Sequence, residues 1–507
     1  MDNASVSSGP PPSKTYVIAR QLFLRLMGGI YFLAFLSLTY QTKGLWGKEG
    51  ILPAADYLNV ARQFYAGRHL WQHPTIFWLG SGDGVLLAAC WAGMGLGLLL
   101  MCGLVPAVTC ALLWMLYVSF IYIGQDFLSF QWDILLVEVG FLCIFFSPWR
   151  WTLSSRREPV PRVILLLLYV VLFKVMMQSG LVKLHSKDPA WADLTALTYH
   201  YWTQPIPNPV SWYVHQLPLW LQKFSCLMMF IIELFVPCWI FLGRWMRRAA
   251  FLPLVGLQVL ILSTGNYCFF NLLMIVLCVL LLDDQVWRRL LPGNLTDLLD
   301  TTADTDAAPG WFGWTKYGIC IGVAIVITVL NIGLGLRMSY GTKSVPRPLA
   351  ALNKALSPWL LTNSYGLFAV MTKTRPEIEI QGSTDGQTWK TYPFRYKAGR
   401  LDRRPPQVAP YQPRVDWQMW FAGLSGRLER SPWFLRMMER IAEGSPAVLD
   451  LLGENPFPDK PPKYFRAKLY HYEFTTPAER AATGNWWKRS YQRMYMPEVY
   501  LKKAGRP

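Results

Sequence analysis

The 507-residue chain is 53% hydrophobic and only 16% charged, whereas an average soluble protein carries about 25% charged residues. This composition excludes intrinsic disorder and argues against an ordinary soluble enzyme. The net charge is +18, and 15% of the residues are aromatic, a content typical of chains that meet lipid headgroups. The composition therefore predicts a membrane protein, with most of the excess positive charge after Ser339.

Hydrophobic stretches follow one another through the first two thirds of the chain. A helix rises about 1.5 Å per residue, so roughly 20 apolar residues cross the hydrocarbon layer. Residues 1–20 lack a cleavable signal pattern, and we expect the first stretch to be a signal-anchor helix. The nine predicted spans, which make up a polytopic α-helical membrane domain, are Leu22–Tyr40, Gly84–Leu104, Val105–Gly124, Ile134–Trp149, Val163–Val182, Leu219–Leu242, Ala249–Thr264, Tyr267–Leu282 and Lys316–Leu336.

The distribution of lysine and arginine between the loops predicts the orientation, because basic flanks stay on the cytoplasmic side. With the N-terminus inside, the cytoplasmic segments hold Lys14, Arg20, Arg150, Arg156, Arg157, Arg162, Arg244, Arg247, Arg248, Arg288 and Arg289. The opposite loops hold Lys43, Lys48, Arg62, Arg68, Lys183 and Lys187. An odd number of spans then places the C-terminal region outside the cytoplasm.

Three regions are predicted: a cytoplasmic tail at 1–20, a transmembrane domain at 21–338 and a soluble extracytoplasmic domain at 346–507. In the last, alternation over Glu377–Gln381 and a turn at Thr384–Gly386 predict a β-hairpin. Helices are predicted over Asp416–Arg430 and Pro432–Glu443, and Pro477 is typical of a helix first turn. We expect a β-sandwich-like unit with appended helices.

Ionisable side chains within the predicted spans include Arg25, Glu138, Lys174 and Glu233. Each costs roughly 3 kcal/mol or more in a bilayer unless it is paired or hydrated, so we expect each to face the protein interior. They form either a polar cavity or relay, or two interhelical ion pairs. Asp133 and Glu138 are five residues apart and point to different helix faces, which argues against a catalytic carboxylate pair.

The loop from Lys183 to Pro218 collects histidines among tryptophans. A desolvated Lys183 near His185 and His200 could act as a base, whereas an interfacial loop with anchoring aromatics explains the same pattern. No spacing matches a metal site or a phosphate-binding loop. The sequence therefore assigns no catalytic residue, metal or cofactor, and the predicted side of the basic tail argues against a nucleic-acid partner.

Many ordered motifs resemble the lipase maturation factor family of multi-pass membrane proteins. They are Gly44–Pro53, Phe130-Gln-Trp-Asp133 with Glu138, Ser179–Leu184, Tyr199–Tyr201 with Gln204-Pro205, Thr264–Tyr267 with Phe269–Asn271, Tyr365–Phe368, Met371-Thr372, Arg375-Pro-Glu377, Gln381–Ser383 and Asp416–Phe421. The resemblance covers nearly the whole chain. A more distant similarity to vitamin K-dependent carboxylase membrane domains, which have an active-site lysine near the position of Lys183, keeps an enzyme alternative open.

The resemblance implies a chaperone-like factor in the endoplasmic reticulum membrane that helps dimeric secreted lipases reach an active form, with the C-terminal domain engaging the client. The tail has no cysteine and no Asn-x-Ser/Thr sequon, the only two being at Asn3 and Asn294. Both absences depart from the animal members and fit a bacterial relative, whose location would be the plasma membrane. The expected partners are membrane lipids and a secreted lipase or another exported protein.

The predicted client-binding residues lie in one helix of the C-terminal domain. They are Arg414, Trp417, Trp420 and Phe421. Aromatic side chains within one helical turn can anchor an apolar patch on a partner, although packing into the domain core explains them equally. A transporter is the third interpretation, on the strength of the intramembrane charges.

Overall fold

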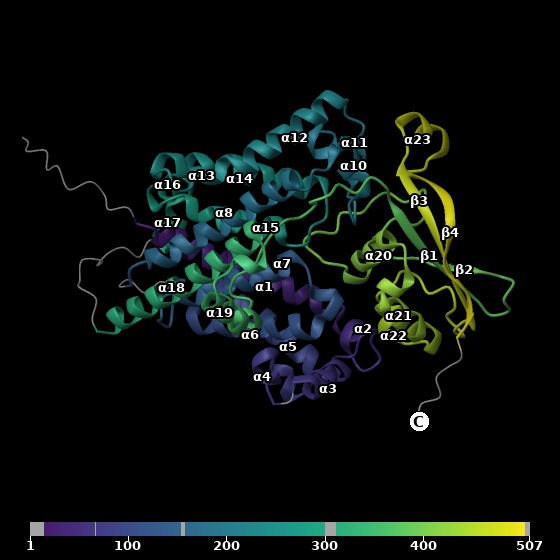
Figure 1. Cartoon of the computed structure of the whole chain (residues 1–507), viewed down its shortest axis with the longest axis horizontal. Helices are drawn as coiled ribbons and strands as arrows, with labels where there is room; N and C mark the ends of the chain where they lie inside the picture. The colour runs from purple at the N-terminus through teal and green to yellow at the C-terminus, as the bar shows by residue number, and fades with distance from the viewer. Residues whose placement is uncertain (1–14, 66, 154–157, 300–310, 502–507) are drawn as a thin grey trace, which may run out of the picture.

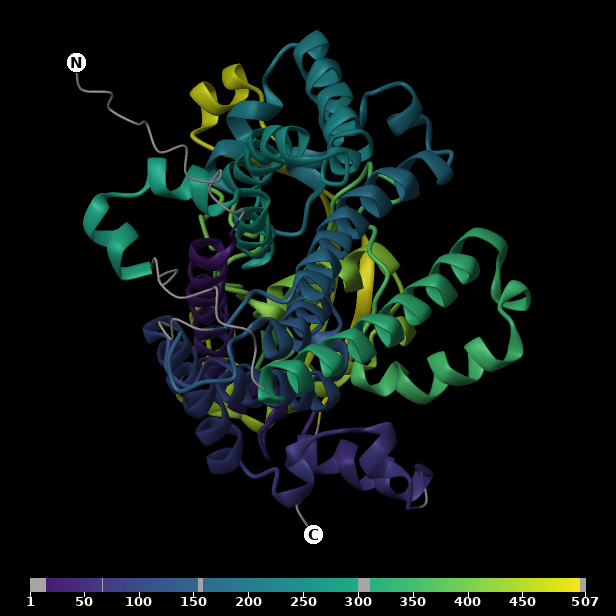
Figure 2. The ribbon, with the colours of Figure 1, turned by 90° about the vertical axis from the view of Figure 1, so that its left-hand side faces the viewer.

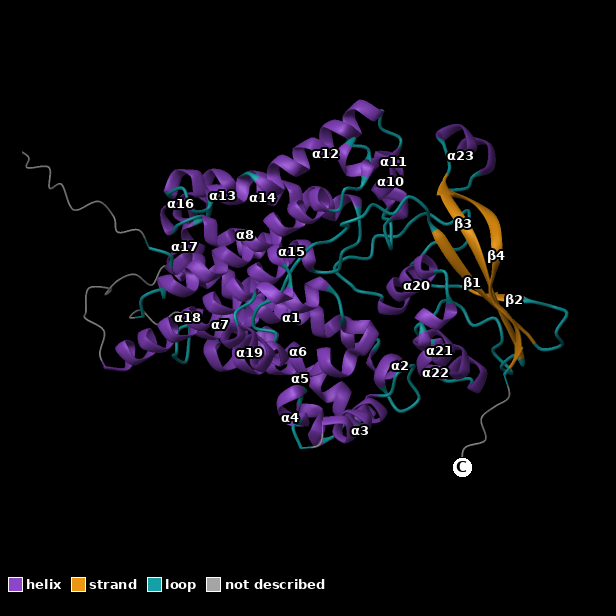
Figure 3. Cartoon of the chain, viewed as in Figure 1, coloured by secondary structure: helices purple, strands orange, loops and turns teal. Residues whose placement is uncertain are grey.

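The computed structural model describes residues 15–65, 67–153, 158–299 and 311–501. A helical bundle is joined to a C-terminal region that holds the β-strands, all at one end of the molecule (Figure 1 and Figure 3). The predicted cytoplasmic charges of Lys14, Arg156 and Arg157, and the sequon at Asn3, lie outside the described residues.

Seven helical stretches among the described residues are long and apolar enough to cross a membrane. They contain α1 (Val17–Thr39), α5 (Asp83–Cys102), α6 (Pro106–Gly124), α8 (Arg162–His185), α12 (Leu219–Leu234) with α13 (Val236–Trp239), α14 (Arg244–Thr264) and α18 (Trp311–Tyr340). An eighth stretch is a pair bent by 111°, formed by Phe270–Leu281, which begins with α15 (Phe270–Cys278), and α16 (Asp284–Leu290). The protein is therefore a multi-pass membrane protein.

The predicted span Ile134–Trp149 corresponds to α7 (Gln131–Phe146), which has only 16 residues. At about 1.5 Å per residue it is shorter than the hydrocarbon layer. Its side chains are mostly buried against α6 and α8. All nine predicted stretches are thus helical, but within the described part of the chain seven are long and apolar enough to cross a membrane, or eight with the bent pair.

Shorter helices connect and flank the spans. They are α2 (Thr42–Trp46), α3 (Ala54–Tyr65), α4 (His69–Gln72), α9 (Pro189–Ala192), α10 (Ala196–Thr203), α11 (Pro209–His215), α17 (Gly293–Leu299) and α19 (Arg347–Leu356). Figure 2 shows α18 and α19 projecting to one side of the bundle. The α9 to α11 segment lies between the bundle and the C-terminal strands (Figure 1).

The C-terminal domain contains one antiparallel sheet of four strands in the order β2-β1-β3-β4. The strands are β1 (Pro376–Ser383), β2 (Lys390–Tyr392), β3 (Tyr464–Phe474) and β4 (Trp487–Tyr500). The predicted hairpin is confirmed, with Ile380 opposite Tyr392. Its turn is held by the Asp385 carboxylate, which accepts hydrogen bonds from the N–H groups of Gln387 and Thr388 at 2.8 Å each.

The predicted appended helices are confirmed, but the described strands form one sheet covered by helices instead of the two sheets of a β-sandwich. The helices of this domain are α20 (Arg414–Ser425), α21 (Pro432–Glu443), α22 (Pro446–Leu449) and α23 (Pro477–Thr483). Helix α20 approaches β1 closely, since a Cβ atom on Gly423 would lie 2.4 Å from the Pro376 carbonyl oxygen. Phe434 of α21 packs edge-on against Tyr495 of β4, with ring centroids 5.3 Å apart.

The two ends of α1 define the two ends of the bundle (Figure 1). At its start, Arg20 donates to the Glu158 carbonyl oxygen at 3.1 Å, and Glu158 forms an ion pair with Lys316. At its far end, Gln41 accepts a hydrogen bond from the Arg414 N–H at 2.9 Å. The C-terminal domain therefore packs on the end of the bundle opposite the start of α1.

Candidate functional site at the junction of the bundle and the C-terminal domain

A buried ion pair joins α7 of the bundle to α20 of the C-terminal domain. The Arg414 Nη2 and Nη1 atoms lie 3.0 and 3.1 Å from the two carboxylate oxygens of Asp133. Tyr117 donates to the same carboxylate at 2.6 Å, and Arg414 also donates to the Phe127 carbonyl oxygen at 2.6 Å. Burial lowers the pKa of Arg414, but the interactions with Asp133 and Tyr117 together outweigh burial and the pKa lies above its ordinary value. Arg414 therefore stays charged and holds the two domains together.

The aromatic residues beside Arg414 continue this contact. The Trp417 ring lies 4.9 Å from the Trp132 ring, and Trp420 donates its indole N–H to the Thr203 carbonyl oxygen at 2.8 Å. Both tryptophans are buried. Phe421 stacks on Phe130 with centroids 6.1 Å apart, yet its exposed fraction is 42%. Of the four predicted client-binding residues, three lie within the junction and Phe421 faces outward.

Glu138 connects the bundle to the segment that follows α19. Its carboxylate forms a 2.5 Å ion pair with Lys174. It also accepts hydrogen bonds from the Tyr365 hydroxyl at 2.7 Å and from the Asn363 N–H at 2.9 Å. Lys174 in turn donates to Asn331 of α18 at 3.0 Å. This carboxylate thus has partners on α8 and in the linker, at positions far apart in the sequence.

The other intramembrane charges have different surroundings. Lys183 and Glu233 form a buried ion pair between α8 and α12, with Nζ 2.7 and 2.8 Å from the two carboxylate oxygens. Arg25 lies at intermediate exposure and donates to the Met101 carbonyl oxygen at 2.7 Å. The two lysines and two glutamates therefore form two separate ion pairs, Lys174 with Glu138 and Lys183 with Glu233. Arg25 is instead held by a carbonyl group near the C-terminal end of α5.

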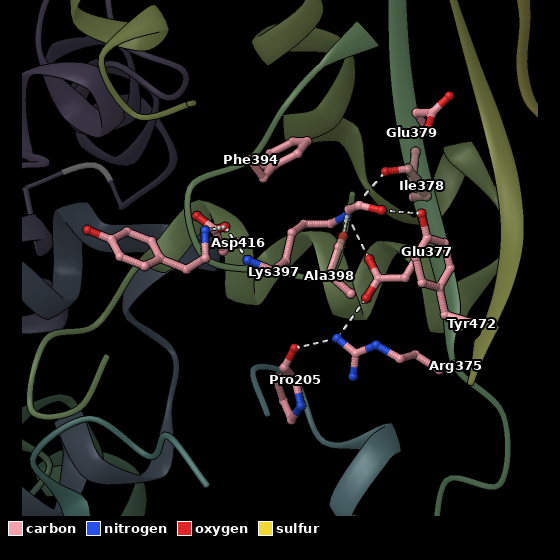
Figure 4. Close-up of polar contacts among 12 residues, drawn as sticks. Pro205, Arg375, Glu377, Ile378, Glu379, Phe394, Lys397, Ala398, Asp416 and Tyr472 are labelled. Atoms are coloured by element: carbon pink, nitrogen blue, oxygen red, sulfur yellow. Dashed lines mark hydrogen bonds and ion pairs between the residues drawn. The ribbon is translucent and has the colours of Figure 1, made fainter. Parts of the chain in front are cut away.

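A chain of three charged residues lies between β1 and α20 (Figure 4). Glu377 stands between two cations, with oxygens 2.7 Å from Arg375 Nη2 and 2.6 Å from Lys397 Nζ. The Asp416 carboxylate accepts the N–H groups of Tyr396 at 2.9 Å and Lys397 at 2.8 Å. Burial raises the pKa of Asp416, whereas the hydrogen bonds from these two N–H groups lower it. This cluster fixes the N-terminal half of α20 against the sheet.

Arg375 extends this cluster into the bundle side of the junction (Figure 4). It donates to the carbonyl oxygens of Trp202 at 3.0 Å and Pro205 at 2.9 Å, and also to that of Gln204. The Trp202 carbonyl belongs to the last turn of α10, where a helix leaves its last C=O groups without intrahelical partners, and the other two carbonyls follow that helix. Burial lowers the pKa of Arg375, and the neighbouring Glu377 opposes that effect.

Two further side chains tie loops of the C-terminal domain to the bundle. Asn266 accepts hydrogen bonds from the N–H groups of Val408 at 2.8 Å and Ala409 at 2.9 Å. Asp188 accepts the N–H of Met371 at 2.6 Å while its other oxygen caps α9 by accepting the Ala190 N–H at 2.9 Å. The junction is therefore closed by side chains from widely separated segments.

Sequence reasoning assigned no role to Arg375, Glu377, Asn266 or Asp188. Two signals in the sequence pointed to them. Arg375-Pro-Glu377 places opposite charges at the start of the predicted hairpin, and Asp188 directly precedes a proline, a common helix N-cap pattern. Neither pattern reveals the distant partners, because those of Arg375 and Asp188 lie on the other side of the junction and Lys397, which pairs with Glu377, lies beyond the hairpin.

The three residues of the enzyme interpretation do not form one site, because Lys183 and His200 line the same cavity whereas His185 is exposed and does not line it. Lys183 is paired with Glu233, and His185 is exposed, with its Nδ1 2.8 Å from the Leu181 carbonyl oxygen. His200 lies 3.1 Å from the Tyr267 hydroxyl through Nε2. Burial lowers the pKa of His200 to about 4, with a smaller effect from Lys183. His185 and Lys183 are two residues apart on α8, so they point to different sides.

Comparison with known proteins places these motifs in a family. Residues 18–289 match the family described as Lipase maturation factor transmembrane domain, and residues 361–497 match the Lipase maturation factor C-terminal domain. Lipase maturation factor 2 of Homo sapiens is 36% identical, over 96% of this chain and 83% of the human protein. Lipase maturation factor 2 of Gallus gallus is 34% identical, over 97% of this chain and 82% of that protein. Lipase maturation factor 1 of Bos taurus is 34% identical, over 96% of this chain and 89% of that protein.

No solved structure matches the chain significantly. The two family matches lie on the two sides of the junction, and both contain the residues that close it. The chain belongs to the lipase maturation factor family.

Proposed function

We propose that this chain is a membrane-bound maturation factor for secreted lipases and that its C-terminal domain engages the client. The observation that carries the proposal is the match to named lipase maturation factors over 96% of the chain, including both the bundle and the C-terminal domain. The family matches give no support to the carboxylase-like alternative. Both carboxylate oxygens of Glu233 also accept hydrogen bonds from Lys183, so that lysine already has a buried partner.

In this proposal the C-terminal domain faces the lumen of the endoplasmic reticulum, or the periplasm in a bacterium. The position of the basic residues in the bundle supports this orientation. Arg20, Arg248 and Lys316 gather with Glu158 and Asp283 at the start of α1, opposite the C-terminal domain. Because basic loops stay in the cytoplasm, that end is the cytoplasmic one. The tail at 1–20 is then cytoplasmic and the domain at 346–507 meets exported proteins.

The junction gives the C-terminal domain a fixed position above the membrane. Arg414, Trp417 and Trp420 hold α20 in place, whereas Phe421 exposes 42% of its surface at the edge of the same helix. A rigid apolar anchor loses little conformational freedom on binding. We therefore assign client contact to Phe421 and a positioning role to the other three residues.

The test uses the full chain in cells that lack a lipase maturation factor and express a dimeric secreted lipase. We expect the chain to restore secreted lipase activity. The Phe421→Ala variant should restore about fivefold less, the loss typical of one interface anchor. Leu435→Ala, which removes a side chain of 43% exposure on the neighbouring α21, is the matched control and should restore activity fully.

Two results would count against the proposal. If the intact chain is expressed at a normal level and lipase activity does not rise, the maturation function is wrong. If activity rises equally with Phe421→Ala and Leu435→Ala, the function stands and the assignment of Phe421 is wrong.

A further inference from the structure

A cavity with apolar walls and one polar end lies between α8, α10, α12, α14 and α15. Its volume is about 360 Å³, within the roughly 300–1,000 Å³ of typical small-molecule sites. The walls include Val175, Met176, Leu221, Met229, Leu257 and Ile261. Most of these residues belong to helices that qualify as membrane spans, so hydrocarbon is the natural partner of this surface.

The polar end of the cavity carries hydrogen-bonding groups without net charge. Lys183 and Glu233 both line it, and their charges cancel within one ion pair. His200 lines the same end and is neutral at pH 7, because burial lowers its pKa to about 4. Its Nε2 atom lies 3.1 Å from the Tyr267 hydroxyl, which completes this end.

A charged headgroup is a poor fit to this arrangement. An anion beside Lys183 would compete with Glu233 and leave a buried carboxylate without its partner, which is strongly unfavourable. A cation beside Glu233 would do the same to Lys183. An uncharged hydroxyl or ester group can accept or donate a hydrogen bond without separating the pair.

We propose that this cavity binds one uncharged membrane amphiphile, whose hydrocarbon chain lies between α8, α12 and α14 and whose hydroxyl or ester groups lie beside Lys183 and His200. Diacylglycerol has this chemistry. The occupant would also contact the linker to the C-terminal domain, because Leu367 and Phe368 line the cavity. Phe368 accepts a hydrogen bond from the Trp191 indole at 3.1 Å, so the ligand would rest against a structured part of the junction.

The experiment uses the purified full chain in phosphatidylcholine nanodiscs with a diacylglycerol probe that carries a photoreactive group in one acyl chain. Mass spectrometry identifies the labelled peptides. We expect saturable labelling of α8, α12 or α14 that unlabelled diacylglycerol displaces and phosphatidic acid does not. Because no lipase is present, the outcome is independent of the proposed maturation function.

Ser225 is the position at which to fill the cavity, since its small side chain lines it. Ser225→Trp should lower the labelling about tenfold. Leu227→Trp, at a position with 42% exposure on the same helix, is the control and should label as the unmodified chain does. If Ser225→Trp does not fold, Ser179→Phe fills the cavity from α8.

Three results would overturn the proposal. The first is labelling that does not saturate, which indicates bulk lipid contact. The second is equal labelling in the folded filled variant and the control. The third is displacement by phosphatidic acid as effective as that by diacylglycerol, which would show that the site accepts a charged headgroup.

Discussion

Arg414 and Asp133 form a buried bidentate ion pair, although they lie 281 positions apart in the sequence. Asp133 is fully buried and Arg414 is 1% exposed. The pair joins the first turn of α7 to the first turn of α20, so the position of the C-terminal domain depends on a charge inside the bundle. A tethered domain that keeps one orientation always presents the same surface on that side of the bundle.

Replacing one member of this pair should destabilise the protein strongly. Asp133→Leu leaves the Arg414 guanidinium buried without its carboxylate, and the expected cost is about 3–5 kcal/mol. The apparent melting temperature of the purified chain in detergent measures this effect. The double variant Asp133→Leu with Arg414→Met removes both charges and should recover much of the loss. A single variant as stable as the original chain would show that the pair does not hold the junction.

Trp417 and Phe421 should separate stability from client contact. Trp417→Ala removes a buried ring that packs on Trp132, and we expect a loss of about 3–5 kcal/mol of stability. Phe421→Ala removes a half-exposed ring and should cost roughly 1 kcal/mol or less, since surface truncations are mild. Thermal unfolding of the two variants side by side checks the difference. Equal losses would mean that Phe421 is a structural residue, too.

His200 predicts a pH dependence of stability. Its pKa is lowered by burial from 6.5 to about 4. The imidazole of the unfolded chain therefore binds a proton below about pH 6.5, whereas that of the folded chain binds one only below about pH 4. Stability falls as the pH falls through this window. At about pH 5 the loss is roughly 2 kcal/mol.

Melting temperatures at about pH 7.5 and about pH 5 measure this loss. His200→Gln should reduce the drop between the two conditions, because no imidazole is left to titrate. His185→Gln, at an exposed histidine, is the control and should leave the drop unchanged. An identical drop in both variants would assign the pH dependence to other groups.

A glycosylation acceptor in the C-terminal domain tests the proposed orientation. Lys488 lies on β4 with a side-chain exposure of 45%, and Lys488→Asn creates an Asn-Arg-Ser sequon. In a eukaryotic host we expect an endoglycosidase-sensitive increase in mass, because only the lumenal side is glycosylated. The natural sequon at Asn294 should stay unmodified. Modification at Asn294 alone would reverse the orientation.

Local sequence patterns correctly predicted the elements that depend on nearby residues or on the thickness of the membrane. The helix over Pro432–Glu443 is confirmed with its bounds, and Pro477 begins α23. The hairpin is confirmed because its turn residues determine the geometry. The different directions of Asp133 and Glu138 also follow from helical periodicity, and the structure shows them bound to different partners.

The sequence by itself therefore determined the apolar spans, the local helices and turns, and the need to shield each intramembrane charge. Only the tertiary structure decided that Glu138 pairs with Lys174 and also binds Tyr365, that Asp133 pairs with Arg414, and that one sheet covered by helices replaces a sandwich. Periodicity is a property of one segment, whereas the partner of a buried charge depends on how distant segments pack.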